Sequence, residues 1–141
     1  MRFCVMVLAT AESETGASPD LAMLEAMTAF NEQLVAAGVM AAADGLKPTS
    51  AGARVRFDGS TRTVRPGPFP LTDSTLAGFW IWNVDSLEAA IEWVKKAPNP
   101  MDGPSEIEIR PLYELEDFSE ASPDLMAKEK QMREQLARNS N

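Results

Sequence analysis

Hydrophobic residues fall into short runs and helical stripes that predict an alternation of strands and helices. Residues 3–8 and 78–84 are largely apolar at consecutive positions, a pattern typical of buried central strands. Residues 105–110 alternate instead, and Ile107 and Ile109 are expected to face inward in a half-buried strand. The chain therefore has at least three strands that need a covered face.

Helix start signals and apolar spacing predict three helices. Ser18, Pro19 and Asp20 supply a hydroxyl cap, a proline at the first helical position and an acid in the first turn. That helix is expected to end at Gly38 in the left-handed conformation. The second begins at Asp85 or Ser86, and the third covers residues 122–138. The expected buried stripes are Met23, Met27, Phe30 and Leu34 in the first helix, and Leu87, Ala90, Ile91 and Val94 in the second.

Residues 54–65 predict a β-hairpin, for which two registers are possible. The favoured register turns at residues 59–60, because it keeps the two valines on one face. In this register Arg54 lies opposite Arg65, and like charges opposed across strands are destabilising. An anionic ligand, or a carboxylate from elsewhere in a dimer, would relieve the repulsion. The simpler interpretation is a solvated edge hairpin that resists aggregation.

The segments between these elements are expected to be irregular. Residues 10–17 are small, polar and acidic and predict a mobile loop. Residues 39–43 are expected to form a short strand, followed by a turn at Asp44 and Gly45. Residues 66–74 predict a proline-rich loop.

This order of elements predicts a ferredoxin-like α+β domain, in which two helices cover one face of an antiparallel sheet. Residues 79–84 are apolar on both faces, so the second face also needs cover. The simplest cover is an identical subunit, which predicts a homodimer with sheets face to face. The domain is expected to span residues 1–118 and a C-terminal helical tail residues 119–141. The apolar positions of the tail are too sparse to form a core of its own.

Amino-acid composition and charge indicate which partners and which cellular compartment to expect. The 141 residues are 45% hydrophobic and carry a net charge of −8, which disfavours nucleic acid and anionic membrane surfaces as partners. No apolar run is long enough to span a membrane. Cys4 is the single cysteine, so no intrachain disulfide can form. We expect a cytoplasmic protein whose N-terminus is a strand and not a signal peptide.

The absence of histidine excludes several chemistries. It removes Ser-His-Asp and Cys-His nucleophiles as well as histidine-ligated metal sites. Carboxylates alone could bind Mg²⁺ or Ca²⁺, but no EF-hand or comparable loop is present. Cys4 lies in an apolar run without an adjacent base, so packing explains it better than reactivity. No cofactor and no metal are therefore predicted.

Several short motifs follow one another in an order that resembles a known family. They are residues 2–8, 37–39, 44–46, 67–69, 77–80, 87–96 and 107–111. Over residues 1–112 the chain resembles the YCII-related family, in particular its DGPF branch. The resemblance implies a dimeric α/β barrel with a pocket between sheet and helices. It also implies a poorly defined function, although a few relatives in the wider family are lyase-like enzymes that use a His–Asp pair.

The sequence departs from this pattern where chemistry would matter. Pro66 replaces the aspartate that gives the branch its name. Leu71 and Asp73 stand where an acid and a lysine usually follow, and only Thr72 is kept between them. With no histidine in the chain, the acid–base pair of the family cannot be assigned to any residue.

The candidate ligand-binding residues combine charge, aromatic surface and the family loop. They are Arg54, Arg65, Phe69, Thr72, Asp73 and Trp80. Each also has a simpler explanation. The arginines could be solvated, Asp73 and Asp44 could serve turns or caps, and Trp80 with Trp82 could belong to the core or a dimer interface.

Three functions are compatible with this sequence. The first is a non-catalytic, dimeric small-molecule-binding or accessory protein, whose ligand is small and anionic or aromatic. The second is a lyase or isomerase that uses Asp44 or Asp73 and holds a small anionic substrate with arginines. The third is an interaction module that recruits a partner through the tail from Glu114 onward. Transcriptional machinery is one such partner, since the branch resembles proteins often encoded beside sigma factors.

Overall fold

The computed structural model describes residues 1–140, which form two compact units, Met1–Pro111 and a second unit that begins at Leu112. The predicted α+β class is confirmed. The first unit consists of β1 (Arg2–Leu8), α1 (Ala11–Glu14), α2 (Leu21–Ala36), β2 (Met40–Gly45), the 3-10 helix η1 (Thr49–Ala51), β3 (Ala53–Asp58), β4 (Thr61–Pro66), β5 (Leu76–Asn83), α3 (Leu87–Lys95) and β6 (Ile107–Pro111).

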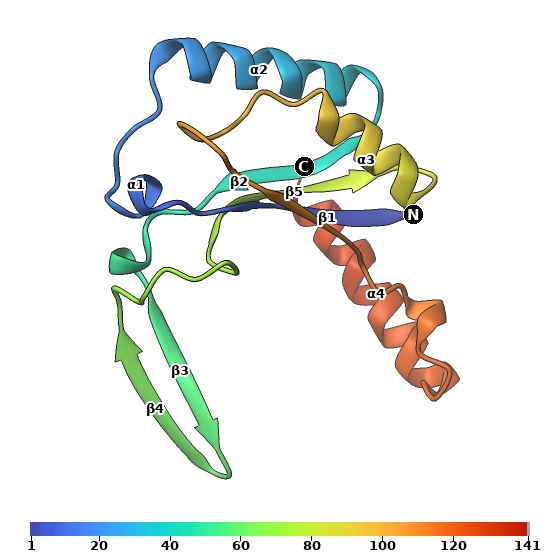
Figure 1. Ribbon diagram of the computed structural model, residues 1–141. Coiled ribbons are helices and arrows are strands. Elements are labelled where there is room, and N and C mark those ends of the chain that lie inside the picture. The colour runs from blue at the N-terminus through green and yellow to red at the C-terminus, as the bar shows by residue number, and fades with distance from the viewer. Residues whose placement is uncertain (141) are drawn as a thin grey trace. The chain divides into compact units, whose positions relative to one another are not determined.

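Four strands form an antiparallel sheet in the order β2-β5-β1-β6. Helices α2 and α3 lie on one face of it (Figure 1). Because side chains alternate along a strand, every second residue of β1 and β5 points toward these helices. The buried core consists of Phe3, Val5, Val7, Phe30, Leu34, Val39, Trp80, Trp82 and Ala90.

The second face of the sheet carries apolar residues as well. Cys4 pairs with Ile81 and Met6 with Phe79, and these four side chains alternate with the core positions. All four are half-buried and none packs against the core cluster. Neither α2 nor α3 covers this face (Figure 1), which we call the open face.

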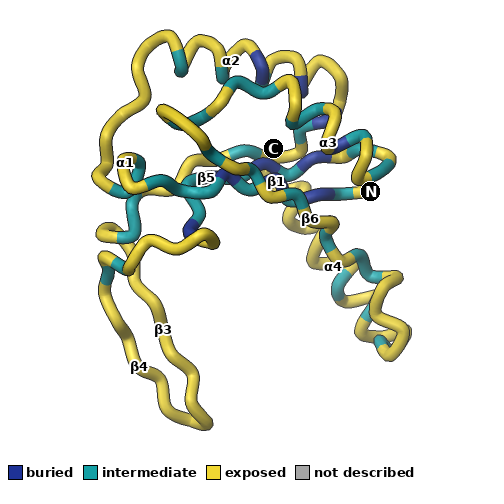
Figure 2. The backbone as a smooth tube through the Cα atoms, viewed as in Figure 1, coloured by how far each residue is buried: buried dark blue, intermediate teal, exposed yellow. Residues whose placement is uncertain are grey.

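The β3–β4 hairpin forms a separate two-stranded sheet, and its register is the favoured one of the two. Val55 pairs with Val64 and Arg54 with Arg65. Gly59 has φ +56°, as a tight hairpin turn requires. Every residue of both strands is exposed, so the hairpin is yellow throughout in Figure 2. It extends from the unit on the side of the sheet opposite to α2 and α3 (Figure 1).

Two predictions about the N-terminal half are wrong. Residues 10–17 contain the short helix α1, whose capping box joins Thr10 and Ser13 through reciprocal side-chain to backbone hydrogen bonds. Helix α2 begins at Leu21 and not after Ser18, because the Asp20 carboxylate accepts the Met23 N–H at 2.8 Å. The predicted end holds, since Gly38 has φ +71°.

Two further predictions are wrong, because sheet pairing determines the conformation of Asp44 and Gly45 and the orientation of α3 determines which of its side chains are buried. Asp44 and Gly45 form no turn, because they extend β2 and pair with Phe79 and Gly78. Ser86 caps α3 as expected, and Ala90 is fully buried. Leu87 and Ile91, however, are 41% and 37% exposed, so the buried stripe of α3 is narrower than predicted.

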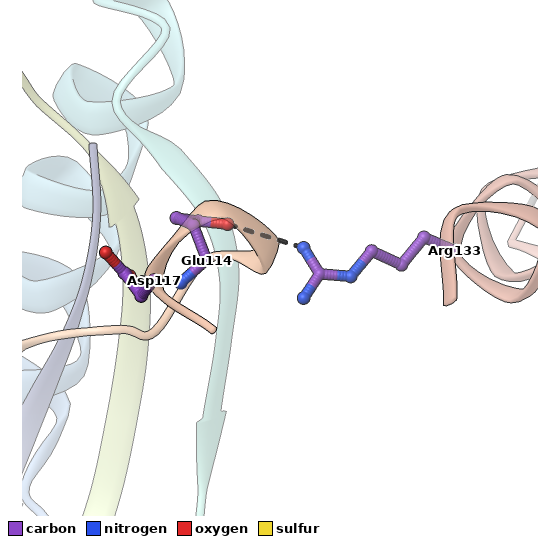
Figure 3. Close-up of polar contacts among 3 residues, drawn as sticks. All are labelled: Glu114, Asp117 and Arg133. Carbon is purple, nitrogen blue, oxygen red and sulfur yellow. Dashed lines mark hydrogen bonds and ion pairs between the residues drawn. The ribbon is translucent and has the colours of Figure 1, made fainter. Parts of the chain in front are cut away.

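The second unit consists of the 3-10 helix η2 (Leu115–Asp117) and helix α4 (Pro123–Asn139). Ser122 caps α4 as predicted. Arg133 Nη1 donates to Glu114 Oε2 at 3.3 Å, and the Glu114 backbone N–H donates to Asp117 Oδ2 at 2.7 Å (Figure 3). None of the α4 side chains is buried. Within residues 1–140 no helix has the length and apolar character needed to cross a membrane.

Candidate functional site

A cleft of about 680 Å³ lies between the sheet and α2 in the first unit. Its walls come from β2 and β5, from α2, from the segment around α1 and from residues 100–102. The α1 segment is held to the last of these, because Thr10 Oγ1 donates to Met101 Sδ at 3.6 Å. The volume is within the range of ligand pockets, roughly 300–1,000 Å³.

The floor of the cleft is apolar and rests on the core. Trp80 is 5% exposed, and its indole N–H donates to Asn31 Oδ1 at 2.9 Å. Its ring meets that of Phe30 edge-on, with centroids 6.2 Å apart. Met23 and Met27 precede Asn31 by eight and four residues on α2, so the three side chains share one helix face. This arrangement offers a hydrophobic floor with one fixed amide.

Carboxylates surround this floor. The acidic residues that line the cleft are Glu12, Glu14, Asp20, Asp44 and Asp102. Asp44 pairs with Phe79, so it borders the cleft with its backbone while its side chain leaves the sheet on the open face. Within residues 1–140 no lysine or arginine lines it. Glu14 accepts from the backbone N–H and Oγ1 of Thr49, and Asp20 caps α2. The other three carboxylates have no hydrogen bond or ion pair among the described residues. The cleft is therefore an acidic concavity, which favours neutral or cationic ligands and disfavours anionic ones.

A second cluster lies at the root of the hairpin. The Arg54 and Arg65 guanidinium carbons lie 4.0 Å and 5.1 Å from the centroid of the Phe69 ring. Cation–π contacts with this ring stabilise both guanidinium groups, which would otherwise repel each other across the strands. Thr49 Oγ1 accepts the Phe69 N–H at 3.0 Å and donates to Glu14 at 2.7 Å. A chain of contacts therefore runs from the cleft wall to the hairpin.

Gly67 permits this packing, because a Cβ atom there would lie 1.8 Å from the carbonyl oxygen of Thr49. Its N–H also donates to Gly52 O at 2.9 Å. The glycine of the family loop is thus required by a close approach of two backbones. No phosphate or ligand role is needed to explain it.

The structure separates the six sequence-derived candidates into three places. Arg54, Arg65 and Phe69 form the hairpin-root cluster, whereas Trp80 lines the cleft. Thr72 and Asp73 do not line the cleft. The Thr72 N–H donates to Thr75 Oγ1 at 3.0 Å, and Asp73 Oδ1 accepts from the Ser74 hydroxyl at 3.4 Å. Both thus serve the loop before β5.

Sequence reasoning missed most of the cleft. Asn31 gave a usable signal, because it is a polar residue on the apolar stripe of α2. Glu12 and Glu14 could have been placed once the capping box of α1 was recognised. Thr49 and Asp102 lie in segments without a periodic pattern, so only tertiary structure places them near the cleft or the hairpin root.

Outside the cleft and the hairpin root, the Cys4 thiol is the side chain to consider as a nucleophile. Burial raises the pKa of the Cys4 thiol, and the Arg110 guanidinium partly opposes this by lowering it. The thiol is therefore protonated near neutral pH and is a weak nucleophile. Within the described part of the chain, no three His, Cys, Asp or Glu residues gather in a way that could hold a metal ion.

Comparison with known proteins places the chain in a family. The sequence profile of the YCII-related domain matches residues 1–116. An uncharacterized protein of Rhizobium meliloti (strain 1021) is 30% identical over 93 residues, which cover 66% of this chain and 75% of the relative. The profile match includes every element of the first unit, and with it the cleft and the hairpin. The chain therefore belongs to the YCII-related family.

Proposed function

We propose that the protein is a non-catalytic small-molecule-binding or accessory protein, and that its ligand occupies the cleft between the sheet and α2. The carrying observation is the combination of about 680 Å³ of concave space with an apolar floor and an acidic surround. Ligand pockets typically combine such a floor with a few polar groups that orient the ligand. Here Asn31 supplies the fixed amide and Trp80 the aromatic surface.

The ligand we propose has an apolar or aromatic body and a neutral or cationic head. An anionic ligand would have to lie among carboxylates, and no lysine or arginine of the described part of the chain lines the cleft to balance them. The arginines that suggested an anion lie on the hairpin, where Phe69 already contacts two of them. The sequence predicted a small ligand that is anionic or aromatic. The cleft is suited to an aromatic ligand and not to an anionic one.

An enzymatic alternative would depend on Asp44 or Asp73. Asp73 does not line the cleft, and its contact with Ser74 gives it a role in the loop. Asp44 is among the lining residues, but it pairs with Phe79, so its side chain leaves the sheet on the open face. A lyase or isomerase that uses either aspartate is therefore the weaker alternative, and binding without turnover separates our proposal from it.

For the assembly we propose a homodimer of ferredoxin-like domains, paired through their open faces as a dimeric α/β barrel. The strand order β2-β5-β1-β6 with both helices on one face supports this arrangement. Met6, Phe79 and Ile81 give the open face its apolar surface. An isologous pair would cover both copies of that surface at once. We also propose a cytoplasmic location, for which a single unpaired cysteine is suited.

Thermal denaturation in the presence of a metabolite collection tests the proposed binding. A ligand selective for the native state raises stability by RT ln(1 + [L]/K_d), about 2.7 kcal/mol at a hundredfold excess over K_d. We expect the stabilising compounds to be neutral or cationic and to have an apolar body. A hit list dominated by carboxylates and phosphates would contradict the proposed ligand class, and turnover of a hit would favour the enzyme.

Charge-matched variants then locate the site. Glu12→Gln should weaken a cationic hit by up to about fivefold, or ~1 kcal/mol, which is the upper end for partly exposed ion pairs. Glu25→Gln removes one negative charge from an exposed position of α2 that does not line the cleft. This control should leave affinity unchanged. Equal effects of the cleft and control variants would place the ligand elsewhere.

A further inference from the structure

The β3–β4 hairpin is an exposed element that its own unit does not cover. All of its strand residues are exposed, and Val55, Phe57 and Val64 on one of its faces are 47%, 70% and 66% exposed. Arg62 completes this face, and its guanidinium carbon lies 4.4 Å from the centroid of the Phe57 ring. An isolated two-stranded hairpin is marginally stable in water, and three strands or a packing partner are normally needed. The apolar face therefore requires a surface that lies outside the unit.

The hairpin is nevertheless held firmly at its root. Arg54 and Arg65 stack on Phe69, whose N–H is bound by Thr49. The backbone of Gly67 is close to that of Thr49 and is tied to Gly52. These contacts fix the direction in which the hairpin leaves the unit, as a docking arm requires.

Charge identifies the surface that the hairpin fits. It carries four arginines and one aspartate, a net of +3, in a chain whose net charge is −8. The rest of the chain is therefore strongly acidic. A second copy of this chain offers a complementary acidic surface, and the pairing is reciprocal in a two-fold dimer.

Reach also favours a second copy. Each strand has six residues, or roughly 20 Å at about 3.3 Å per residue. Two sheets packed face to face are only about 10 Å apart. The hairpin extends on the open-face side of its own sheet (Figure 1), so in the proposed dimer it would pass beyond the gap and lie against the partner.

We infer that the β3–β4 hairpin is a dimerisation arm, and that its apolar face, Val55, Phe57 and Val64, docks on a second copy of this chain. The inference rests on the proposed face-to-face dimer, but it is independent of ligand binding in the cleft. It assigns Arg62, which pairs with Phe57 and shares this face, to recognition between subunits and not to a small anion. The other three arginines lie on the opposite face of the hairpin and contribute long-range attraction to an acidic partner.

Sedimentation equilibrium of the full chain tests the arm. Phe57→Ser should raise the dimer dissociation constant at least about tenfold, as truncation of a buried interface aromatic typically does. Leu21→Ser is the matched control, because Leu21 is also 70% exposed but lies at the start of α2. This control should leave the constant unchanged.

Val55→Thr with Val64→Thr guards against simple loss of the hairpin, since threonine keeps the β-branched shape and strand preference. This double variant should also raise the dimer dissociation constant. In a separate measurement, higher salt should raise the dissociation constant of the wild-type dimer, because salt screens the attraction between the basic hairpin and an acidic partner.

The possible failures are distinguishable. If Phe57→Ser dimerises as tightly as the wild type, the arm is refuted while the open-face dimer stands. If the wild-type chain stays monomeric at high micromolar concentration, both the dimer and the arm are refuted. Stabilisation by a cleft ligand would be unaffected by either result. If the hairpin instead binds a different acidic protein while the dimer ignores Phe57→Ser, that result also overturns the inference.

Discussion

The cleft and the hairpin carry opposite charge within one acidic domain. Five acidic residues and, among residues 1–140, no lysine or arginine line the cleft, whereas the hairpin holds four arginines and one aspartate. A concave acidic region suits a small neutral or cationic molecule, and a protruding basic one suits an acidic protein surface. In the sequence the arginines and Trp80 were grouped as one candidate site. In the structure they lie in two separate regions.

The two regions also differ in how they are supported. The cleft floor rests on Trp80 and Phe30, which belong to the core cluster. The hairpin contributes no buried side chain to that core. Substitutions should therefore affect monomer stability in one region and association in the other.

The largest expected effect comes from the helix that walls the cleft. Leu34 lies on the buried face of α2 and is fully buried, so Leu34→Ala should lower the free energy of unfolding by about 2–5 kcal/mol. Val64→Ala on the hairpin should change it by less than ~0.5 kcal/mol at protein concentrations low enough to keep the chain monomeric. Urea denaturation measures both. Comparable losses would mean that the hairpin packs within its own monomer.

An intermediate effect is expected at the hairpin root. Gly67→Ala would place a Cβ 1.8 Å from Thr49 O, so the backbone must shift, at a cost on the order of 1–3 kcal/mol. Gly52→Ala is the matched control, because its Cβ would meet the same oxygen at 3.7 Å, an ordinary contact. Hydrogen exchange should show faster opening of hairpin amides in the first variant only. Equal exchange in both would show that the root does not hold the arm.

The smallest effect concerns Cys4 on the open face, which belongs to neither region. Burial raises its pKa, so the folded chain keeps the thiol proton to higher pH than the unfolded chain. The associated stability is complete well below about pH 8.5, the ordinary pKa at which the unfolded thiol is half ionised, and is lost as the pH rises through the raised folded pKa. Cys4→Ser should flatten this decline between neutral and alkaline pH in chemical denaturation. An unchanged slope would show that the thiol is not desolvated.

Local patterns predicted the elements better than they predicted the site. Consecutive apolar residues identified β1 and β5, and the shared face of Val55 and Val64 favoured the correct one of the two hairpin registers, because both signals act over a few residues. Asp44 was misplaced in a turn because pairing with β5 extends β2, which is a tertiary effect. The same dependence on tertiary structure explains why most residues of the cleft were not predicted. Trp80 was recognised from its own side chain, whereas its hydrogen-bond partner Asn31 and the lining residue Glu12 come from elements whose approach only the fold determines.

The tryptophan indole N–H resonances offer the most direct test, because the chain contains three tryptophans in different surroundings. Trp80 lines the cleft, whereas Trp93 lies on α3 and does not line it. Titration with a cationic aromatic compound, followed by heteronuclear NMR, should shift the Trp80 indole and the Asn31 side-chain amide and leave Trp93 unchanged. The carboxylate analogue of the same compound should bind more weakly. Movement of Trp93 with Trp80 unchanged, or tighter binding of the carboxylate, would contradict an acidic ligand-binding cleft between the sheet and α2.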